Sequence, residues 1–456
     1  MTTHAMTYRQ HLRAILGLGL PLIGGHLAQF AIGLTDTVMI GWYGVPELAA
    51  LTLAATLFFT LFLVGSGFAW AVMPMVANFA ARGEETQIRR ATRMALWLSI
   101  AYFALSMPAL WFADPILRAL GQTEQIAADA QTYLRIAGWG MLPALFVMVL
   151  KNYLAALEFT RVAFWVTVVA ALANGLGNYA LIFGNWGAPE LGLRGAAIAS
   201  IVTQVLSVLG MLGYALWRLP EHTLLRRFWN PDTEMLARVF ALGVPIGLTS
   251  LAEVGMFAAT AVMMGWLGTV PLAAHGIALQ ISSATFMAHL GLANVATVRA
   301  GNALGRGDGD HLRRGAAVAL AASGAVVAAT ILLFLGAPAW LMGLFVDPAD
   351  PARDAIVAAG VTFLAVAALF QLVDAAQVVT LGLLRGLQDT RVPMLIAALA
   401  YWGLGLPGAY VFGLTLGYGG PGIWFGLVLG LGVAAVLLLT RFQRHSRVAI
   451  PAATGS

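Results

Sequence analysis

Long apolar runs separated by short polar gaps dominate this chain. A helix needs about 20 apolar residues to cross the hydrocarbon core of a bilayer, and most of these runs reach that length. The pattern predicts about twelve membrane-spanning helices and hence an all-α polytopic membrane protein. The expected helices lie near residues 14–40, 48–80, 92–113, 130–155, 162–184, 195–217, 237–267, 272–302, 315–345, 355–384, 392–414 and 421–440.

Composition agrees with a membrane protein. Of the 456 residues, 60% are hydrophobic and only 10% are charged, whereas a soluble chain carries roughly a quarter of its residues as charges. The net charge of +5 would indicate nucleic-acid binding only if basic and aromatic residues gathered on one folded face. Here the basic residues fall in the gaps between apolar runs, so we expect no nucleic-acid partner.

The basic residues also orient the helices, because positive side chains are retained on the cytoplasmic side of a membrane. With the N-terminus inside, most of the 25 Lys and Arg residues fall in cytoplasmic gaps. An even number of spans then places both termini in the cytoplasm, and we expect a multi-pass protein of the cell inner (plasma) membrane. The outside gaps keep only Arg118, Arg135, Arg194 and Arg353.

The chain contains an internal repeat. The stretch that begins at Gly19 aligns without a gap with the stretch that begins at Gly243, so that Pro21 meets Pro245. The register recovers later, where "LEFTRV" meets "LQDTRV". Both halves start inside, so they are parallel repeats, an arrangement typical of transporters. We predict two six-helix lobes around a central cleft, although duplication alone could also build a stable bundle. The predicted boundaries are 1–218 for the N-lobe, 219–235 for a cytoplasmic linker, 236–441 for the C-lobe and 442–456 for a cytoplasmic tail.

Motifs of catalysis are missing from the sequence. The chain has no Cys, which excludes disulfides and thiolate catalysis. It shows no Walker loop, Ser–His–Asp set or His-rich metal spacing. We therefore expect a protein that is not an enzyme, has no cofactor, and is driven by an ion gradient of H⁺ or Na⁺.

Three acids lie deep inside predicted helices: Asp36, Glu253 and Asp374. A charged side chain at bilayer depth costs about 2.5–3.5 kcal/mol, so such residues usually face a cavity and act on ions or substrate. The repeat does not share them, because Asp36 meets Thr260 and Glu253 meets Gln29. Symmetric packing therefore does not explain these acids, and we predict that they couple transport to an ion. Glu253 and Asp374 belong to one lobe and are expected to share a proton or a cation.

Polar residues near these acids are further candidates. Asn174 and Asn178 are four residues apart and share one helix face. They could coordinate a cation with Asp36, or they could simply hydrogen-bond neighbouring helices. Gln29, the repeat partner of Glu253, is a further candidate for cation or substrate binding.

Several other residues are expected to shape or pack the helices. Pro21, Pro143 and Pro245 lie inside predicted helices and would bend them, which a rocking bundle can use. His26 and His289 are more typical of packing, since the sequence offers neither of them a partner.

The stretches "PLIGGHLAQFAIGLTDTVMIGWYG", "LANGLGNYALIFG", "GLRGAAIAS" and "GLLRGLQDTRVPM" resemble the MATE (multidrug and toxic compound extrusion) family, and in particular its NorM-like branch. The resemblance implies two six-helix lobes and export of cationic, often aromatic compounds by antiport with sodium or protons. It also implies that Asp36, Asn174 and Asn178 form a site in the N-lobe, and that Glu253 and Asp374 form one in the C-lobe.

Two functions remain in competition at this stage. The first is a secondary antiporter that exports small organic cations, is in contact with membrane lipid, and works as a monomer. The second is a flippase of the same superfamily that moves a lipid or lipid-linked saccharide; such a protein would line its cavity with Arg or Lys. A scaffold without transport would tolerate loss of the acids. The coupling ion stays open: sodium could bind at Asp36, Asn174 and Asn178 or at Glu253 and Asp374, while a proton is favoured at Asp36.

Overall fold

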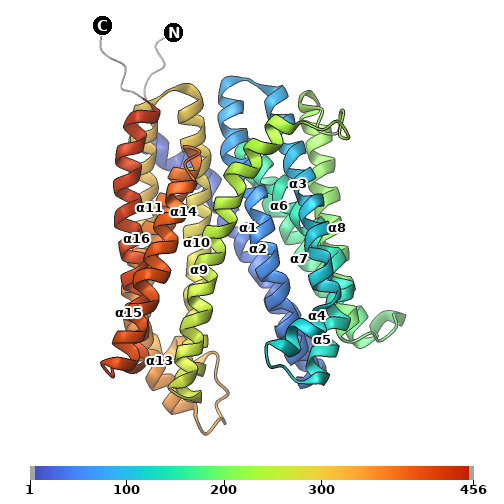
Figure 1. Ribbon diagram of the computed structural model, residues 1–456, viewed down its shortest axis with the longest axis vertical. Coiled ribbons are helices and arrows are strands. Elements are labelled where there is room, and N and C mark those ends of the chain that lie inside the picture. Colours follow the sequence, from blue (N-terminus) through green and yellow to red (C-terminus); the bar gives the residue numbers. More distant parts are fainter. Residues whose placement is uncertain (1–5, 451–456) are drawn as a thin grey trace. The chain divides into compact units, whose positions relative to one another are not determined.

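The computed structural model describes residues 6–450, apart from the side chain of Val45. Within this part of the chain, twelve helical stretches are long and apolar enough to cross a membrane, as the sequence predicts. Figure 1 shows their arrangement. The helices of residues 6–218 are α1 (Tyr8–Tyr43), α2 (Val45–Arg82), α3 (Glu85–Trp111), α4 (Ala113–Ala119), α5 (Glu124–Ala137), α6 (Met141–Ala156), α7 (Thr160–Phe183) and α8 (Leu193–Arg218). Those of the remainder are α9 (Thr233–Trp266), α10 (Thr269–Arg306), α11 (Gly309–Gly336), α12 (Pro338–Gly343), α13 (Arg353–Gly386), α14 (Arg391–Ala398), α15 (Leu406–Tyr410) and α16 (Gly419–Ala449).

Three of the predicted helices differ in detail from the structure. The stretch expected at 315–345 ends at Gly336, because Pro338 begins the separate helix α12. The stretch at 130–155 is interrupted by a 3₁₀ turn, η1 (Gly138–Gly140), between α5 and α6. The stretch at 392–414 includes two π-helical segments, η4 (Leu399–Gly405) and η5 (Val411–Thr415). Segments of this kind are rare and often mark functional sites.

The chain forms two compact units. Unit 1 combines the chain up to Ile23 with the chain from Leu248 onward, and unit 2 contains Gly24–Gly247. The division falls inside α1 and inside α9, close to Pro21 and Pro245, rather than in the linker where we divided the predicted lobes. Each of these two helices therefore contributes its beginning to one unit and its end to the other.

Close glycine contacts explain why the beginning of α1 belongs to unit 1 and the beginning of α9 belongs to unit 2. In unit 2, a Cβ on Gly67 of α2 would lie 2.3 Å from the carbonyl oxygen of Gly243 in α9, so the two backbones touch. In unit 1, a Cβ on Gly291 of α10 would lie 2.9 Å from the backbone nitrogen of Ile23 in α1. Gly67 and Gly291 occupy equivalent places in the repeat. Only glycine permits such close approach of helix backbones.

The linker that precedes α9 is held against α3 within unit 2. Arg90 Nε donates to Asp232 Oδ2 at 2.6 Å, and Arg90 Nη2 donates to Glu234 Oε2 at 2.8 Å. Arg93 Nη1 donates to the Arg227 carbonyl oxygen at 2.7 Å. The hydrogen bond from Arg90 lowers the pKa of Asp232, so this carboxylate stays charged at neutral pH.

Candidate functional site

Unit 2 gathers the predicted acid and amides in one place. Asp36 lies on α1, Asn174 and Asn178 on α7, and Ser200 on α8. Asn178 Nδ2 donates to Asp36 Oδ1 at 2.5 Å and also to Asn174 Oδ1 at 3.3 Å. Ser200 Oγ donates to Asp36 Oδ2 at 3.3 Å. The two asparagines are completely buried, and Asp36 is half-buried.

Small residues bring α7 and α8 close enough to form this group. A Cβ on Gly177 would lie 3.3 Å from the Cβ of Ala199, and one on Gly195 would lie 2.4 Å from the Leu181 carbonyl oxygen. Such contacts between small residues are how membrane helices pack. Because Ala199 precedes Ser200, the contact places the Ser200 hydroxyl near α1.

The group around Asp36 suits a negative charge and leaves further ligand atoms available. Both carboxylate oxygens accept hydrogen bonds from neutral donors. Asn178 Oδ1 and Asn174 Nδ2 are buried and have no hydrogen-bond partner among the described residues. Buried polar atoms normally have a partner. Oxygens of Asp36, Asn174 and Asn178 could thus bind a small cation, and Asp36 could equally receive a proton.

The other candidates of unit 2 lie outside this group. Gln29 is exposed, two turns before Asp36 on α1. His26 is 7% exposed, as is Lys151 of α6. Lys151 Nζ lies 3.9 Å from the position of a Cβ on Gly25, which places the ammonium beside α1. Lys151 falls near the end of the helix expected at 130–155, and the structure places it inside α6, which continues to Ala156.

Unit 1 brings the two remaining acids within electrostatic range of each other. Glu253 lies on α9 and Asp374 on α13, and their charges interact. Asp374 is 2% exposed, and its Oδ1 has no hydrogen-bond partner within the described part of the chain. Arg385, which we expected in a loop, lies in the last turn of α13 and interacts electrostatically with Glu253.

Two glutamines lie one helical turn before and after Asp374 on α13. Gln377, one turn further along α13, donates from Nε2 to Tyr401 Oη at 2.7 Å, and Gln371 donates from Nε2 to the Ser282 carbonyl oxygen at 3.3 Å. Both glutamines are completely buried, and neither Oε1 has a hydrogen-bond partner among the described residues. A surplus of buried acceptors is stabilised by a proton on the carboxyl group or by a bound cation.

Sequence reasoning missed several of these residues. Ser200 ends the quoted stretch "GLRGAAIAS", but one hydroxyl in an apolar helix carries no signal of its own. Tyr401 lies in the π-helical segment η4, which shifts the helical register in a way that a 3.6-residue pattern does not predict. Gln371 and Gln377 flank Asp374 at one-turn spacing, and that spacing could have identified them.

The remaining predicted residues are structural in character. Pro143 lies in the first turn of α6, directly after the 3₁₀ turn η1, where a proline is tolerated. Pro21 and Pro245 lie inside α1 and α9, and their proposed role in bending stays a prediction. His289 Nδ1 hydrogen-bonds Ser323 Oγ at 2.8 Å, as expected for a packing residue.

Comparisons with known proteins agree with this arrangement of helices. The model of the MatE family matches residues 21–180 and 245–411, once in each repeat. The chain is 45% identical over 449 residues to the "Probable multidrug resistance protein NorM" of Rhizobium meliloti (strain 1021), covering 97% of this chain and 96% of the relative. It is 44% identical to the protein of the same name from Agrobacterium fabrum, covering 95% and 93%.

The fold is also that of solved structures. The eukaryotic MATE transporter AtDTX14 superimposes with a TM-score of 0.85 at 18% identity, covering 97% of this chain and 98% of that one. The spanning helices and the family match together define a multi-pass helical transporter, which is not an enzyme. The chain belongs to the MATE family, and its close relatives carry the name NorM.

Proposed function

We propose that this protein is a secondary active antiporter that exports organic, cationic aromatic compounds in exchange for protons or sodium. The observation that carries the proposal is the pair of acid sites, one within each unit: Asp36 accepts hydrogen bonds from a neutral amide and a hydroxyl, and Asp374 interacts with Glu253. The names of the relatives, which describe multidrug resistance, support export of drugs.

Exchange follows from competition for negative charge. A carboxylate that is partly removed from water is stabilised by a cation, whether this is H⁺, Na⁺ or an organic cargo. If cargo and coupling ion favour different conformations, binding of one promotes release of the other. The same acids can then bind the coupling ion as it enters and the cargo as it leaves, and no chemical bond has to change.

The site at Asp36 and the site at Glu253 and Asp374 differ in the groups that surround their carboxylates. Asp36 accepts hydrogen bonds from Asn178 and Ser200, which stabilise its charged form. Asp374 instead lies one helical turn from Gln371 and from Gln377, whose amide oxygens have no hydrogen-bond partner among the described residues. Arg385 acts electrostatically on Glu253. We propose that the Glu253–Asp374 pair retains a proton or sodium ion through much of the cycle, and that Asp36 gains and loses its proton during transport.

Proteoliposomes test the coupling ion. We expect an outwardly directed efflux of ethidium when only a proton gradient is imposed, because carboxylates are the groups that titrate at both sites. A sodium gradient alone is expected to drive transport only if the oxygens near Asp374 form a sodium site. An ethidium transport rate that is the same with and without each gradient would contradict antiport.

One observation favours a different cargo. Lys151 is a buried ammonium, the type of group that a phosphate-bearing lipid requires. Export of a lipid or lipid-linked saccharide is therefore the second candidate. Translocation of a fluorescent lipid, measured in the same liposomes, separates the two: the antiporter proposal predicts that ethidium moves and that the lipid does not.

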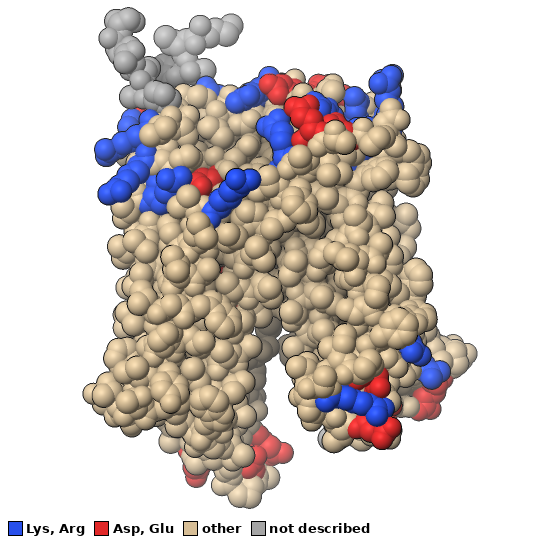
Figure 2. All heavy atoms as spheres, in the orientation of Figure 1, with Lys and Arg blue, Asp and Glu red and all other residues tan. Residues whose placement is uncertain are grey.

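We further propose that the protein lies in the cell inner membrane as a monomer with both termini in the cytoplasm. Within each unit, most Lys and Arg side chains gather at one end, and few lie at the other (Figure 2). Positive side chains are retained on the cytoplasmic side, which supports this orientation.

A further inference from the structure

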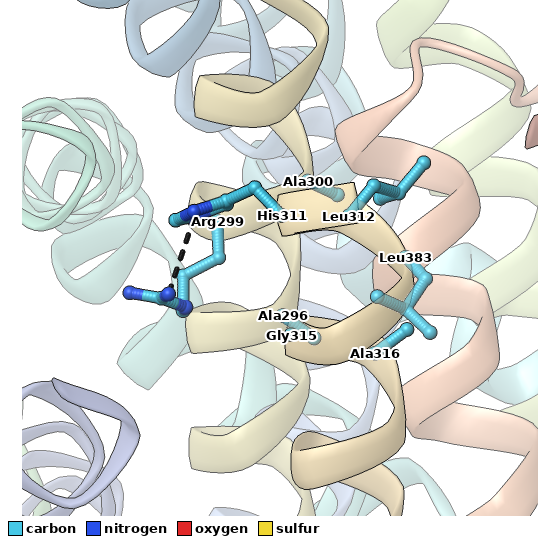
Figure 3. Close-up of a pocket in the computed structure, with 8 residues that line it drawn as sticks. All are labelled: Ala296, Arg299, Ala300, His311, Leu312, Gly315, Ala316 and Leu383. Carbon is cyan, nitrogen blue, oxygen red and sulfur yellow. Dashed lines mark hydrogen bonds between the residues drawn. The ribbon is translucent and has the colours of Figure 1, made fainter. Parts of the chain in front are cut away.

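A buried arginine in unit 1 has histidines as its hydrogen-bond partners. Arg299 of α10 is 7% exposed, and His11 of α1 and His311 of α11 are 0% and 8% exposed. Arg299 Nη2 lies 2.6 Å from His11 Nδ1 and 3.2 Å from His311 Nε2. Figure 3 shows Arg299 and His311 directed towards each other from neighbouring helices. Gly315 of α11 lies beside the group, since a Cβ there would lie 3.6 Å from His11 Nδ1, an ordinary contact distance.

The geometry determines the protonation of both imidazoles. A guanidinium group only donates hydrogen bonds and keeps its charge. His11 Nδ1 and His311 Nε2 must therefore accept, which requires both rings to be neutral with their protons on the opposite nitrogens. A proton added to either accepting nitrogen removes the acceptor and places two cations in contact. These bonds consequently exist only while both histidines are neutral.

The charged neighbours of the two rings come from three elements. Arg299 faces both rings from α10, Arg314 faces His11 from α11, and Arg306 faces His311 from the end of α10. Asp308, which precedes α11, is the acid that faces both rings, and it also accepts a hydrogen bond from the His311 backbone nitrogen at 2.9 Å. Its single negative charge is smaller than the positive charge of the surrounding arginines.

The group anchors the beginning of α1 within unit 1. Arg314 Nη1 donates to the Met6 carbonyl oxygen at 3.1 Å, and its Cζ lies 5.8 Å from the Tyr8 ring centroid. His11 follows one turn later, and unit 1 keeps the helix as far as Ile23. Beyond that residue the same continuous helix carries Asp36. Release of the first turns of α1 would therefore act on the same helix that carries Asp36.

We propose that Arg299, His11 and His311 form a proton-sensitive latch that fastens the first turns of α1 to α10 and α11. Arg299 is the positioning residue and the two imidazoles are the proton sensors. The latch is closed at neutral and alkaline pH. It opens at a pH below the ordinary imidazole range of about 6.5, because burial and the arginines around the rings oppose a further positive charge. This regulation is separate from the ion exchange proposed above, because it needs no transport.

Distance measurements between two spin labels test the latch. The chain has no Cys, so cysteines at the exposed positions Gln10 and Asp310 can be labelled selectively in the full-length protein. We expect a narrow distance distribution at pH 8 and loss of this narrow peak at pH 4.5. Arg299→Ala is expected to remove the narrow peak at both values.

A matched variant separates proton sensing from a merely structural role. In the double variant His11→Asn and His311→Gln, amide oxygens take the places of Nδ1 and Nε2 and accept from Arg299 without titrating. This variant is expected to keep the narrow peak at pH 8 and at pH 4.5. A wild-type distribution that does not change with pH, or a double variant that still responds to pH, would overturn the proposal. Since no cargo or gradient is involved, the result is independent of whether the protein is an antiporter.

Discussion

Asp36→Asn is expected to reduce drug efflux to the level of cells that lack the protein, while the variant still inserts in the membrane. The substitution keeps the shape of the side chain and removes its negative charge. Asn178 Nδ2 and Ser200 Oγ would then donate to a neutral amide, whose NH₂ group is directed at one of these donors. The site can no longer exchange a proton for a cation, because an amide does not titrate.

Ethidium efflux from whole cells, normalised to the amount of protein in the membrane, measures this effect. Asp354→Asn is a matched control, since Asp354 is an exposed acid in the first turn of α13 and undergoes the same chemical change. Insertion should not suffer in either variant, because removal of an acid from an apolar helix lowers its insertion cost. Wild-type efflux by Asp36→Asn would remove this residue from the mechanism.

Glu253→Gln and Asp374→Asn are each expected to lower the transport rate roughly tenfold or more, which corresponds to about 1.4 kcal/mol. The double variant should be little worse than the poorer single variant. The reason is that the two carboxylates interact electrostatically within unit 1 and would hold one proton or cation between them. Once one carboxylate is lost, the shared ligand is lost as well.

A double-mutant cycle on the transport rates measures this coupling. Gln377→Glu offers a complementary test, because it adds a negative charge beside Asp374 at a position whose amide oxygen has no hydrogen-bond partner among the described residues. It should strengthen cation retention and slow turnover. Losses that simply multiply in the double variant would mean that Glu253 and Asp374 act independently, and the shared site would have to be abandoned.

The sequence predicts the spanning helices well because each must supply about 20 apolar residues, whatever its neighbours are. It also identifies Asp36, Glu253 and Asp374, since an acid at membrane depth costs free energy and stands out against an apolar background. The equivalent matches to the MatE family that begin at Pro21 and Pro245 agree with the repeat found by alignment.

Other features depend on contacts that no local pattern contains. The division of the two units inside α1 and α9 follows from pairs such as Gly67 with Gly243, which are distant in sequence. Tyr401 reaches Gln377 from a π-helical segment. Arg299 falls near the end of the helix expected at 272–302, and only the arrangement of α1, α10 and α11 reveals its histidine partners.

The most direct test of antiport is to run the exchange backwards. Proteoliposomes without any imposed ion gradient are given a gradient of ethidium, and the movement of protons and of sodium is followed with indicator dyes. Because coupling is reciprocal, the wild-type protein is predicted to move one of these ions against the direction of ethidium, and Asp36→Asn is predicted to move neither. Ethidium flux through the wild-type protein with no opposing movement of either ion would contradict the account.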